Sequence, residues 1–144
     1  IGSSAASDVY KRQLLILASM IEKETGTAED RPLIAGVFHN RLRLGMKMQS
    51  DPTVIYGISN FDGNLTRKHL ETPTPFNTYT EMGLPPTPIS NPGWDSLHSA
   101  LQPASVKYLY FVARGDGSSA FSRTLREHQR AVWKYQVQPH RNSR

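Results

Sequence analysis

Apolar side chains near the start of the chain recur every three or four residues, which is the period of an α-helix. This i, i+3, i+4, i+7 spacing predicts a first helix from about Val9 to Thr25, and it is formed by Leu14, Leu17, Ala18 and Ile21. Residues 1–8, IGSSAASD, are small and polar, so we expect a disordered tail there. A second apolar run begins at Pro32, which fits the first turn of a helix, and ends at Gly45, a residue typical of helix ends.

The middle of the chain is rich in proline. A short third helix is predicted over SDPTVIYG, with Asp51 as its cap, Pro52 in its first turn and Gly57 at its end. Residues 58–92 then hold six of the ten prolines, so they cannot form a long helix or a central strand. Long irregular segments in small domains are usually functional or disordered, and aromatic residues such as Tyr79 argue against disorder here.

The last third of the chain predicts a helix and then a hairpin. NPGWDSLHSALQP indicates a fourth helix, with Asn91 as its cap, Pro92 at its start and Pro103 beyond its end. The segment KYLYFVA is rich in Tyr, Phe and Val and predicts a strand. RGDGSSA then reads as a hairpin loop that leads to a short partner strand near Phe121 and Ser122.

A final amphipathic helix is predicted from about Thr124 to Gln136, with Leu125, Val132 and Trp133 on its buried face. The sequence therefore predicts an α+β class that is mainly helical, with one small β-hairpin and a long Pro-rich loop region. We expect a single domain over residues 9–136, followed by a C-terminal tail over residues 137–144.

Composition narrows the possible functions only slightly. The chain has 144 residues and no cysteine, which excludes disulfides, thiol catalysis and Cys-ligated zinc. No apolar run approaches the ~20 residues that a membrane-spanning helix needs. The net charge of +5 is compatible with a nucleic-acid partner, but no long basic stripe with interleaved aromatic residues supports one, so we expect no nucleic acid.

Two carboxylates interrupt the first helix where its apolar stripe should continue, in the segment IEKET. At about 100° per residue, Glu24 lies one turn beyond Ile21 near the edge of that stripe, and Glu22 lies on the other flank. A carboxyl group buried without a cationic partner has a raised pKa, as a general acid requires near neutral pH. The residues alone leave a second interpretation open, in which both acids simply end the helix and pair with Lys23 or Arg31.

Other chemistries find less support. The five histidines lack the spacing of metal ligands, and no nucleophile elbow or phosphate-binding loop is present, so we expect neither a metal nor a cofactor.

Four ordered blocks resemble one known family, the endolytic murein transglycosylases, also called the MltG or YceG-like family. The blocks are ASMIEKET, VFHNRLRLGMKMQSDPTVIYG, LETPTPFNTYTEMGLPPTPISNPG and YLYFVA, and the resemblance runs from about Leu14 to Tyr135. It implies a lysozyme-like catalytic domain that acts on the glycan strands of bacterial peptidoglycan. It also implies a parent protein anchored in the inner membrane by a segment before this chain, with this domain outside the cytoplasm. The cut would fall between N-acetylmuramic acid and N-acetylglucosamine and leave a 1,6-anhydro end.

The resemblance also implies roles for single residues. Glu24-Thr25 takes the place of the Glu-Ser element of the wider lysozyme-like transglycosylases, so Glu24 is the expected acid and base, with Glu22 as a second choice. Gln49, Ser50, Asp51, Asn77, Thr78 and Tyr79 are the expected substrate contacts, with Gln49 suited to an N-acetyl group and Tyr79 to stacking or hydrogen bonding. Asp51 has a second possible role as a helix cap.

Three further residues suit structural roles as well. Asn40 and Arg41 are as well suited to tying the second helix to the loop as to touching substrate, and His128 is expected to pack the last helix against the site. We expect a monomer whose partners are glycan strands and possible cell-wall synthases. A glycan-binding module without catalysis and a hydrolytic muramidase that uses Asp51 remain the alternatives.

Overall fold

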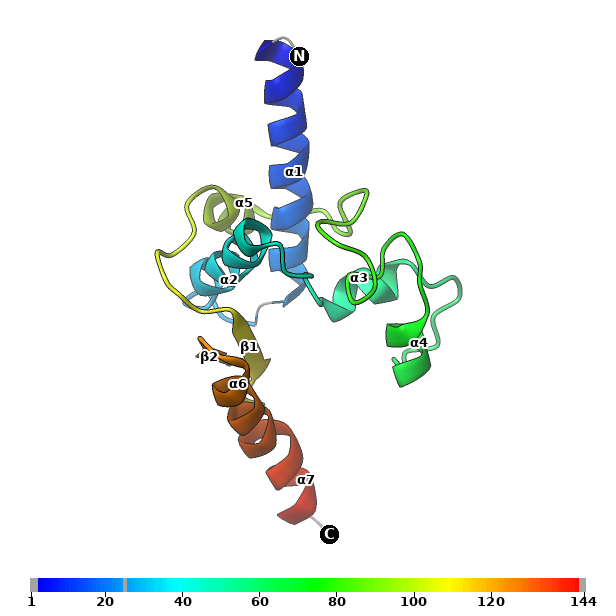
Figure 1. The fold of residues 1–144 in the computed structure, drawn as a ribbon, viewed down its shortest axis with the longest axis vertical. Helices are drawn as coiled ribbons and strands as arrows, with labels where there is room; N and C mark the ends of the chain where they lie inside the picture. Colours follow the sequence, from blue (N-terminus) through cyan, green and yellow to red (C-terminus); the bar gives the residue numbers. More distant parts are fainter. Residues whose placement is uncertain (1–2, 25, 143–144) are drawn as a thin grey trace.

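A computed structural model describes residues 3–24 and 26–142 of the chain (Figure 1). Seven α-helices, one π-helical turn and one two-stranded sheet make up this described part. In chain order they are α1 (Ser3–Glu24), α2 (Arg31–Leu44), α3 (Asp51–Tyr56), α4 (Arg67–Glu71), α5 (Trp94–Leu101), β1 (Tyr110–Ala113), β2 (Ser119–Ser122), α6 (Leu125–Val132), η1 (Trp133–Val137) and α7 (Gln138–Asn142). The predicted α+β class, mainly helical with one small hairpin, is confirmed.

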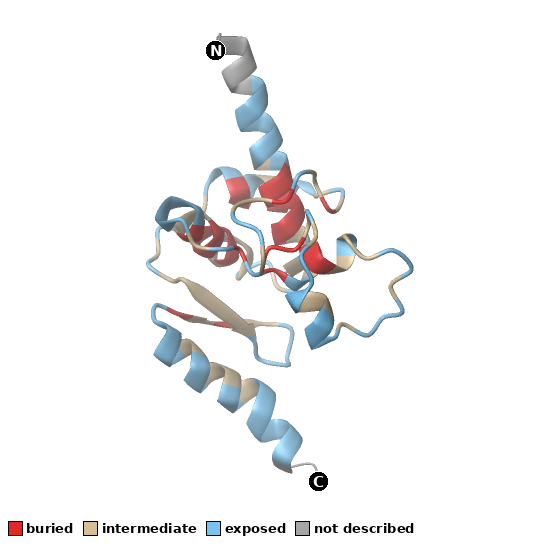
Figure 2. Ribbon diagram, turned by 45° about the vertical axis from the view of Figure 1, so that its right-hand side comes forward, coloured by how far each residue is buried: buried red, intermediate tan, exposed pale blue. Residues whose placement is uncertain are grey.

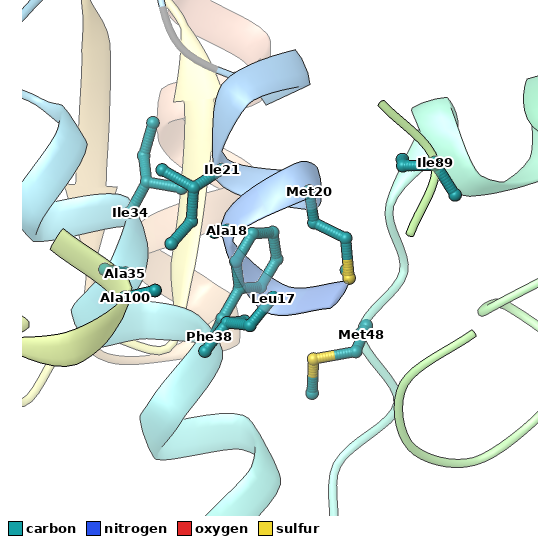
Figure 3. Packing of buried hydrophobic residues seen from close by; sticks show 10 residues of the cluster. All are labelled: Leu17, Ala18, Met20, Ile21, Ile34, Ala35, Phe38, Met48, Ile89 and Ala100. Atoms are coloured by element: carbon teal, nitrogen blue, oxygen red, sulfur yellow. The ribbon is translucent and has the colours of Figure 1, made fainter. Parts of the chain in front are cut away.

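The core forms where α1 packs against α2 and α5 (Figure 3). The apolar stripe of α1 that the sequence predicts is buried, and Ile21 has no exposed surface at all. Phe38 of α2 is the largest fully buried side chain, and Ala100 brings in α5. Burying such apolar side chains contributes about 2 kcal/mol each, so this cluster holds the end of α1 in one position.

Helix α1 is longer than the sequence pattern predicts. It begins at Ser3 rather than Val9, so the expected tail over residues 1–8 is helical from residue 3 onward (Figure 1). Residues 1–2 lie outside the described part, as does Thr25, where the predicted helix would have ended. The amphipathic pattern marks only the packed part of the helix, and the first turns project beyond the body of the molecule.

Helix α5 begins at Trp94 with Gly93 as its N-cap residue, so the prediction of Asn91 as cap and Pro92 at the start was wrong. The reason lies in a distant residue. The carboxylate of Glu22 accepts a hydrogen bond from the N–H of Gly93 at 2.7 Å and another from the hydroxyl of Ser96 at 3.2 Å. Glu22, which belongs to α1, therefore caps the N-terminus of α5. Its negative charge also interacts favourably with the dipole of α5 at that end.

The Pro-rich segment is ordered and contains one helix that the sequence did not predict. Helix α4 is only five residues long and is opened by Thr66, whose hydroxyl accepts a hydrogen bond from the N–H of His69. His69 returns the contact, because its ring nitrogen accepts from the N–H of Thr66 at 3.0 Å. This reciprocal cap replaces the missing apolar periodicity, which is why the periodic pattern gives no signal for α4.

The hairpin lies between the helical body and the C-terminal helix (Figure 2). Strands β1 and β2 pair antiparallel, with Phe111 opposite Phe121. Both rings pack against the core cluster, and Phe38 meets Phe111 edge to face at 5.9 Å. The hairpin thus joins the terminal helix to the rest of the molecule.

The terminal helix differs from its prediction in length and in orientation. It begins at Leu125, after Thr124 as its N-cap residue, which agrees with the predicted start. The helical chain then continues through η1 and α7 to Asn142, so the tail predicted over residues 137–144 is largely helical. Leu125 is 53% exposed and Trp133 is 48% exposed, so they do not form its buried face. The apolar pattern predicted the wrong buried face because the inner face of this helix is partly polar.

Among the described helices, none is long and apolar enough to cross a membrane.

Candidate active site

A cleft of ≈ 580 Å³ opens between the end of α1 and the hairpin with its terminal helix. One wall comes from the end of α1, from residues 48–51 and from Tyr79. The other wall comes from β1, from Ser119 and from the inner face of the terminal helix. The lining residues are Glu24, Arg41, Met48, Gln49, Asp51, Tyr79, Phe111, Val112, Ala113, Ser119, His128, Val132 and Gln136. The cleft therefore brings together residues from both ends of the chain.

Glu24 is the last residue of α1 and lies half-buried in this cleft. The pKa of its carboxyl group is raised from 4.5 to about 7, chiefly by burial and to a smaller extent by the neighbouring charge of Asp51. A hydrogen bond from Ser50 and the charge of Arg41 act in the opposite direction but do not outweigh burial. The group can therefore release and regain a proton near neutral pH, which is the property of a general acid and base.

Ser50 places the Glu24 carboxylate. Its hydroxyl donates a hydrogen bond of 2.7 Å to Oε1 of Glu24, and only 1% of Ser50 is exposed. Ser50 comes from the loop before α3. Thr25, which the resemblance put in the place of the serine of the Glu-Ser element, lies outside the described residues. Ser50 is also the N-cap residue of α3, so the assignment of that cap to Asp51 was wrong.

Asp51 and Tyr79 form a second polar pair in the cleft. The Tyr79 hydroxyl donates a hydrogen bond of 2.6 Å to Oδ1 of Asp51, which lies in the first turn of α3. Burial and this bond raise the pKa of Tyr79, so its hydroxyl stays protonated at neutral pH. The pair fixes the Asp51 charge on the same side of the cleft as Glu24.

Gln49 is exposed in the cleft and has a left-handed backbone with φ of 51°, an uncommon conformation for a residue other than glycine. Its N–H donates to the carbonyl of Thr78 at 3.2 Å, and this contact holds the conformation. Such strained residues cluster at functional sites because the surrounding structure must maintain them. The sequence alone gives no sign of this conformation.

Arg41 ties the two walls together. It is only 6% exposed, and its guanidinium donates to the carbonyl oxygens of Leu109, Lys47 and Met48 at 2.7, 2.9 and 3.2 Å. Asn40 adds two bonds to the same strand-side segment, at the carbonyls of Val106 and Tyr108. Of the two roles left open for these residues, the geometry supports the structural one.

His128 lines the cleft and packs the last helix against it, as the sequence led us to expect. Its ring stacks on Tyr110 with centroids 5.0 Å apart, and Arg41 covers the same Tyr110 ring at 5.1 Å. Burial, with a smaller effect of the Arg41 charge, lowers the pKa of His128. Its Nδ1 is buried and has no hydrogen-bond partner among the described residues. The histidine is therefore a neutral wall residue at pH 7.

Asn77 and Thr78 were expected to touch substrate, but the structure gives them another place. Asn77 has no exposed surface, and its amide donates to the carbonyls of His69, Leu70 and Thr72 at the end of α4. Thr78 is 1% exposed and accepts a bond from the N–H of Ser50 at 2.9 Å. Both side chains lie behind the cleft and shape it. Short polar residues in a loop suit either role, so the sequence could not decide.

Two residues of the far wall had no sequence signal. Ala113 lies at the end of β1, and Gln136 lies in η1, where its amide donates to the Ala113 carbonyl at 2.8 Å. A π-helical turn shifts the residues that face inward, and a periodic pattern cannot reveal such a shift.

A larger groove of ≈ 660 Å³ runs along the middle of α1, lined mainly by apolar side chains with Arg12 and His39. It contains no carboxyl group, so its size does not make it the reactive site. Among the described residues no group of three or more His, Cys, Asp or Glu side chains is placed to hold a metal ion.

The fold and the cleft define a mainly helical α+β domain with a carboxyl group that titrates at neutral pH. The chain belongs to the YceG-like family, whose model matches residues 3–134. The membership that the sequence blocks indicated is thereby confirmed.

Named relatives agree with this membership. A protein from Bacillus subtilis (strain 168), named endolytic murein transglycosylase, is 45% identical over 127 residues, which are 88% of this chain and 35% of that protein. A protein of the same name from Streptococcus pneumoniae (strain D39) is 35% identical over 126 residues, 83% of this chain and 23% of that protein. The chain therefore spans about a third or less of the length of these relatives.

A crystal structure of a YceG-like protein from Listeria monocytogenes has the same fold. It superposes with a TM-score of 0.78 and 46% sequence identity over 83% of this chain and 39% of that one.

Proposed function

We propose that this chain is the catalytic domain of a lytic transglycosylase that cuts the glycan strands of peptidoglycan. Its family membership and the names of its relatives support the substrate class. The observation that carries the chemistry is the half-buried Glu24, whose pKa is raised to about 7 inside the cleft.

In the first step Glu24 acts as the acid. At pH 7 about half of its carboxyl groups hold a proton, which can pass to the oxygen of the glycosidic bond between N-acetylmuramic acid and N-acetylglucosamine. The bond to the anomeric carbon then breaks, and positive charge develops on the muramic ring. The carboxylate that remains, beside the Ser50 hydroxyl, lies in a position to stabilise that charge.

In the second step the same carboxylate acts as the base. It removes the proton of the 6-hydroxyl of the muramic sugar while that oxygen attacks the anomeric carbon. The product is a 1,6-anhydro end, and Glu24 has recovered its proton. Because the attacking oxygen belongs to the substrate, the second carboxylate that an ordinary glycosidase uses is not needed.

Four neighbours of Glu24 support these steps. Ser50 aligns the carboxylate, and the Asp51–Tyr79 pair adds a fixed negative charge that favours the protonated acid. Gln49 is exposed in the cleft and has a side-chain amide, so we assign it to the N-acetyl group of a bound sugar.

The parent protein would work in the cell envelope, outside the cytoplasm, held at the inner membrane by a segment outside this chain. Its partners there would be glycan strands and possible cell-wall synthases, and the domain itself would act as a monomer.

Product analysis tests the proposal. The protein is incubated with purified peptidoglycan, and the released fragments are identified by mass spectrometry. Anhydro-muropeptides are expected. Reducing ends would instead indicate a hydrolase in which Asp51 activates water, and an intact polymer that retains the protein would indicate a binding module.

A further inference from the structure

Two cations share one aromatic ring at the rim of the cleft. The Arg114 guanidinium lies 5.8 Å from the centroid of the Tyr135 ring, and the Lys134 ammonium lies 5.2 Å from the same centroid. Both cationic residues are exposed, and Tyr135 is half-buried. The ring thus gathers two positive charges that would otherwise repel each other.

Among the described residues, neither Arg114 nor Lys134 forms an ion pair with a carboxylate. The nearest anion to Arg114 along the chain is Asp116 in the hairpin loop, whose carboxylate accepts hydrogen bonds from the N–H and the hydroxyl of Ser118. These bonds lower the pKa of Asp116, and the Arg114 charge adds a smaller effect in the same direction. Two exposed cations that form no ion pair can bind an outside carboxylate.

The pair adjoins the cleft along the chain. Arg114 follows Ala113, and Lys134 and Tyr135 precede Gln136. Ala113 and Gln136 both line the cleft, whereas the three residues of the pair and its ring lie outside the lining. The 2.8 Å bond between the Gln136 amide and the Ala113 carbonyl fixes the two elements together at this point. A group attached to a bound polymer can therefore reach the pair from the cleft.

Neutral sugars do not explain this arrangement. Residues 123–142 carry Arg123, Arg126, Arg130, Lys134 and Arg141 against Glu127 alone, five positive charges minus one, or +4 of the +5 of the whole chain. A positive field on one wall favours an anionic substrate. In a strand that carries stems the carboxylates belong to the peptide stems, because the lactyl carboxyl group of the muramic sugar is held in the amide bond to its stem. Only a muramic sugar without a stem has a free lactyl carboxylate.

We propose that Arg114 and Lys134, with Tyr135 between them, bind a carboxylate of the peptide stem and make the enzyme prefer strands that carry stems. This inference rests on the proposed function, because it takes the substrate from there. It adds a binding site to a cleft whose other contacts are with the sugar.

The test compares two substrates by equilibrium binding. One is a set of un-cross-linked glycan strands with intact stems, and the other is the same strands stripped by an amidase that cuts the lactyl–peptide bond and leaves the lactyl carboxylate. All proteins carry Glu24→Gln, so binding is measured without turnover. The site variant adds Arg114→Gln and Lys134→Gln, and the matched control adds Arg126→Gln and Arg130→Gln, which remove the same charge from exposed positions of α6.

We expect tighter binding of stem-bearing strands, and a loss of this preference by about three- to tenfold in the site variant, as two exposed ion pairs would give. The control should keep the preference, and high salt should reduce it for every protein that shows it. Equal weakening on both substrates would overturn the proposal in favour of a general attraction to the strand, and tighter binding of the stripped strands would overturn it in favour of the lactyl carboxylate. An unchanged preference, or none in the parent, would overturn it outright. Cleavage by the protein without Glu24→Gln is measured separately, so failure of the proposed function remains distinguishable.

Discussion

Glu24 lies at the end of α1, half-buried and hydrogen-bonded to Ser50. Glu24→Gln keeps the shape of the side chain but cannot transfer a proton. We therefore expect glycan cleavage to fall by about 10³-fold, within the range that general acid catalysis contributes. Release of anhydro-muropeptides measures the loss. The matched control is Glu22→Gln, which changes the cap of α5 on the same helix end and should retain most of the activity. A fully active Glu24→Gln protein would contradict the assignment.

The same substitution should affect stability in a pH-dependent way. Folding raises the pKa of Glu24 from 4.5 to about 7, so between these values the folded state binds more protons than the unfolded state. Glu24 therefore makes the free energy of unfolding of the parent protein fall as the pH rises through this window. Below and above the window its contribution does not change with pH.

Glu24→Gln has no proton to lose, so it should be more stable than the parent above pH 7 and about equal to it near pH 4. Thermal unfolding at both pH values measures the difference. If the variant were less stable than the parent at pH 8, burial of the ionised Glu24 carboxylate would not destabilise the folded protein.

Ser50 and Asp51 should move the alkaline limb of the activity profile in opposite directions. The Ser50 hydroxyl lowers the pKa of Glu24, and the Asp51 charge raises it. Ser50→Ala should therefore shift the limb to higher pH, and Asp51→Asn should shift it to lower pH. The pH dependence of kcat for both variants checks this. Shifts in the same direction would mean that another group limits the reaction.

At the scale of elements, Asn77 holds the end of α4 and the start of the segment with Tyr79. Its amide donates to three backbone carbonyls, and its Oδ1 accepts from the N–H of Tyr79 at 2.9 Å. Asn77→Ala should lower the free energy of unfolding by about 2 kcal/mol, because the hydrogen bonds of a fully buried side chain are lost.

Asn77→Asp is the informative comparison, because it keeps the acceptor for Tyr79 but replaces the amide donor by a carboxylate oxygen that faces the three carbonyls. We expect it to be destabilised but to keep more activity than Asn77→Ala. Chemical denaturation and cleavage rates measure the two effects. A stable Asn77→Ala protein with weakened substrate binding would instead support the direct contact between Asn77 and substrate that the resemblance implied.

Elements with local signals could be predicted from the sequence. Apolar periodicity found the packed part of α1, and Pro32 with Gly45 bracketed α2 to within a residue. Helix α4 and the true start of α5 could not be found in this way. Both depend on side-chain caps, one from His69 and one from the distant Glu22, and a cap across the fold leaves no periodic pattern.

At the scale of the whole molecule, Arg41 joins three segments that shape the cleft. Arg41→Lys keeps a positive charge, but an ammonium lacks the planar geometry that reaches the carbonyls of Leu109, Lys47 and Met48 together. We expect a loss of about 3 kcal/mol in the free energy of unfolding.

We also expect a lower cleavage rate for Arg41→Lys, because the two walls lose their alignment. Denaturation and kinetics at matched pH measure both effects. Arg43→Lys is a suitable control, since Arg43 is exposed on the same helix and bonds only to Asn40. An Arg41→Lys protein with unchanged stability would exclude the tying role.

The candidate site could be predicted only in part. Glu24 stood out because a carboxyl group interrupted an apolar stripe, and Gln49, Ser50, Asp51 and Tyr79 followed from the resemblance. The far wall had no such signal, since Ala113 and Gln136 have ordinary side chains that matter only through their position. Tertiary contacts decide which neutral residues face a cleft.

The cleft has one further consequence, which follows from the distance in sequence between its walls. Glu24 emerges early during synthesis, whereas His128 and Gln136 emerge near the end of this segment, and contacts so far apart in the chain form late in folding. A half-made chain thus carries its acid without the opposing surface. Under the proposed function, glycan cleavage therefore has to wait until the last helix has folded against the site.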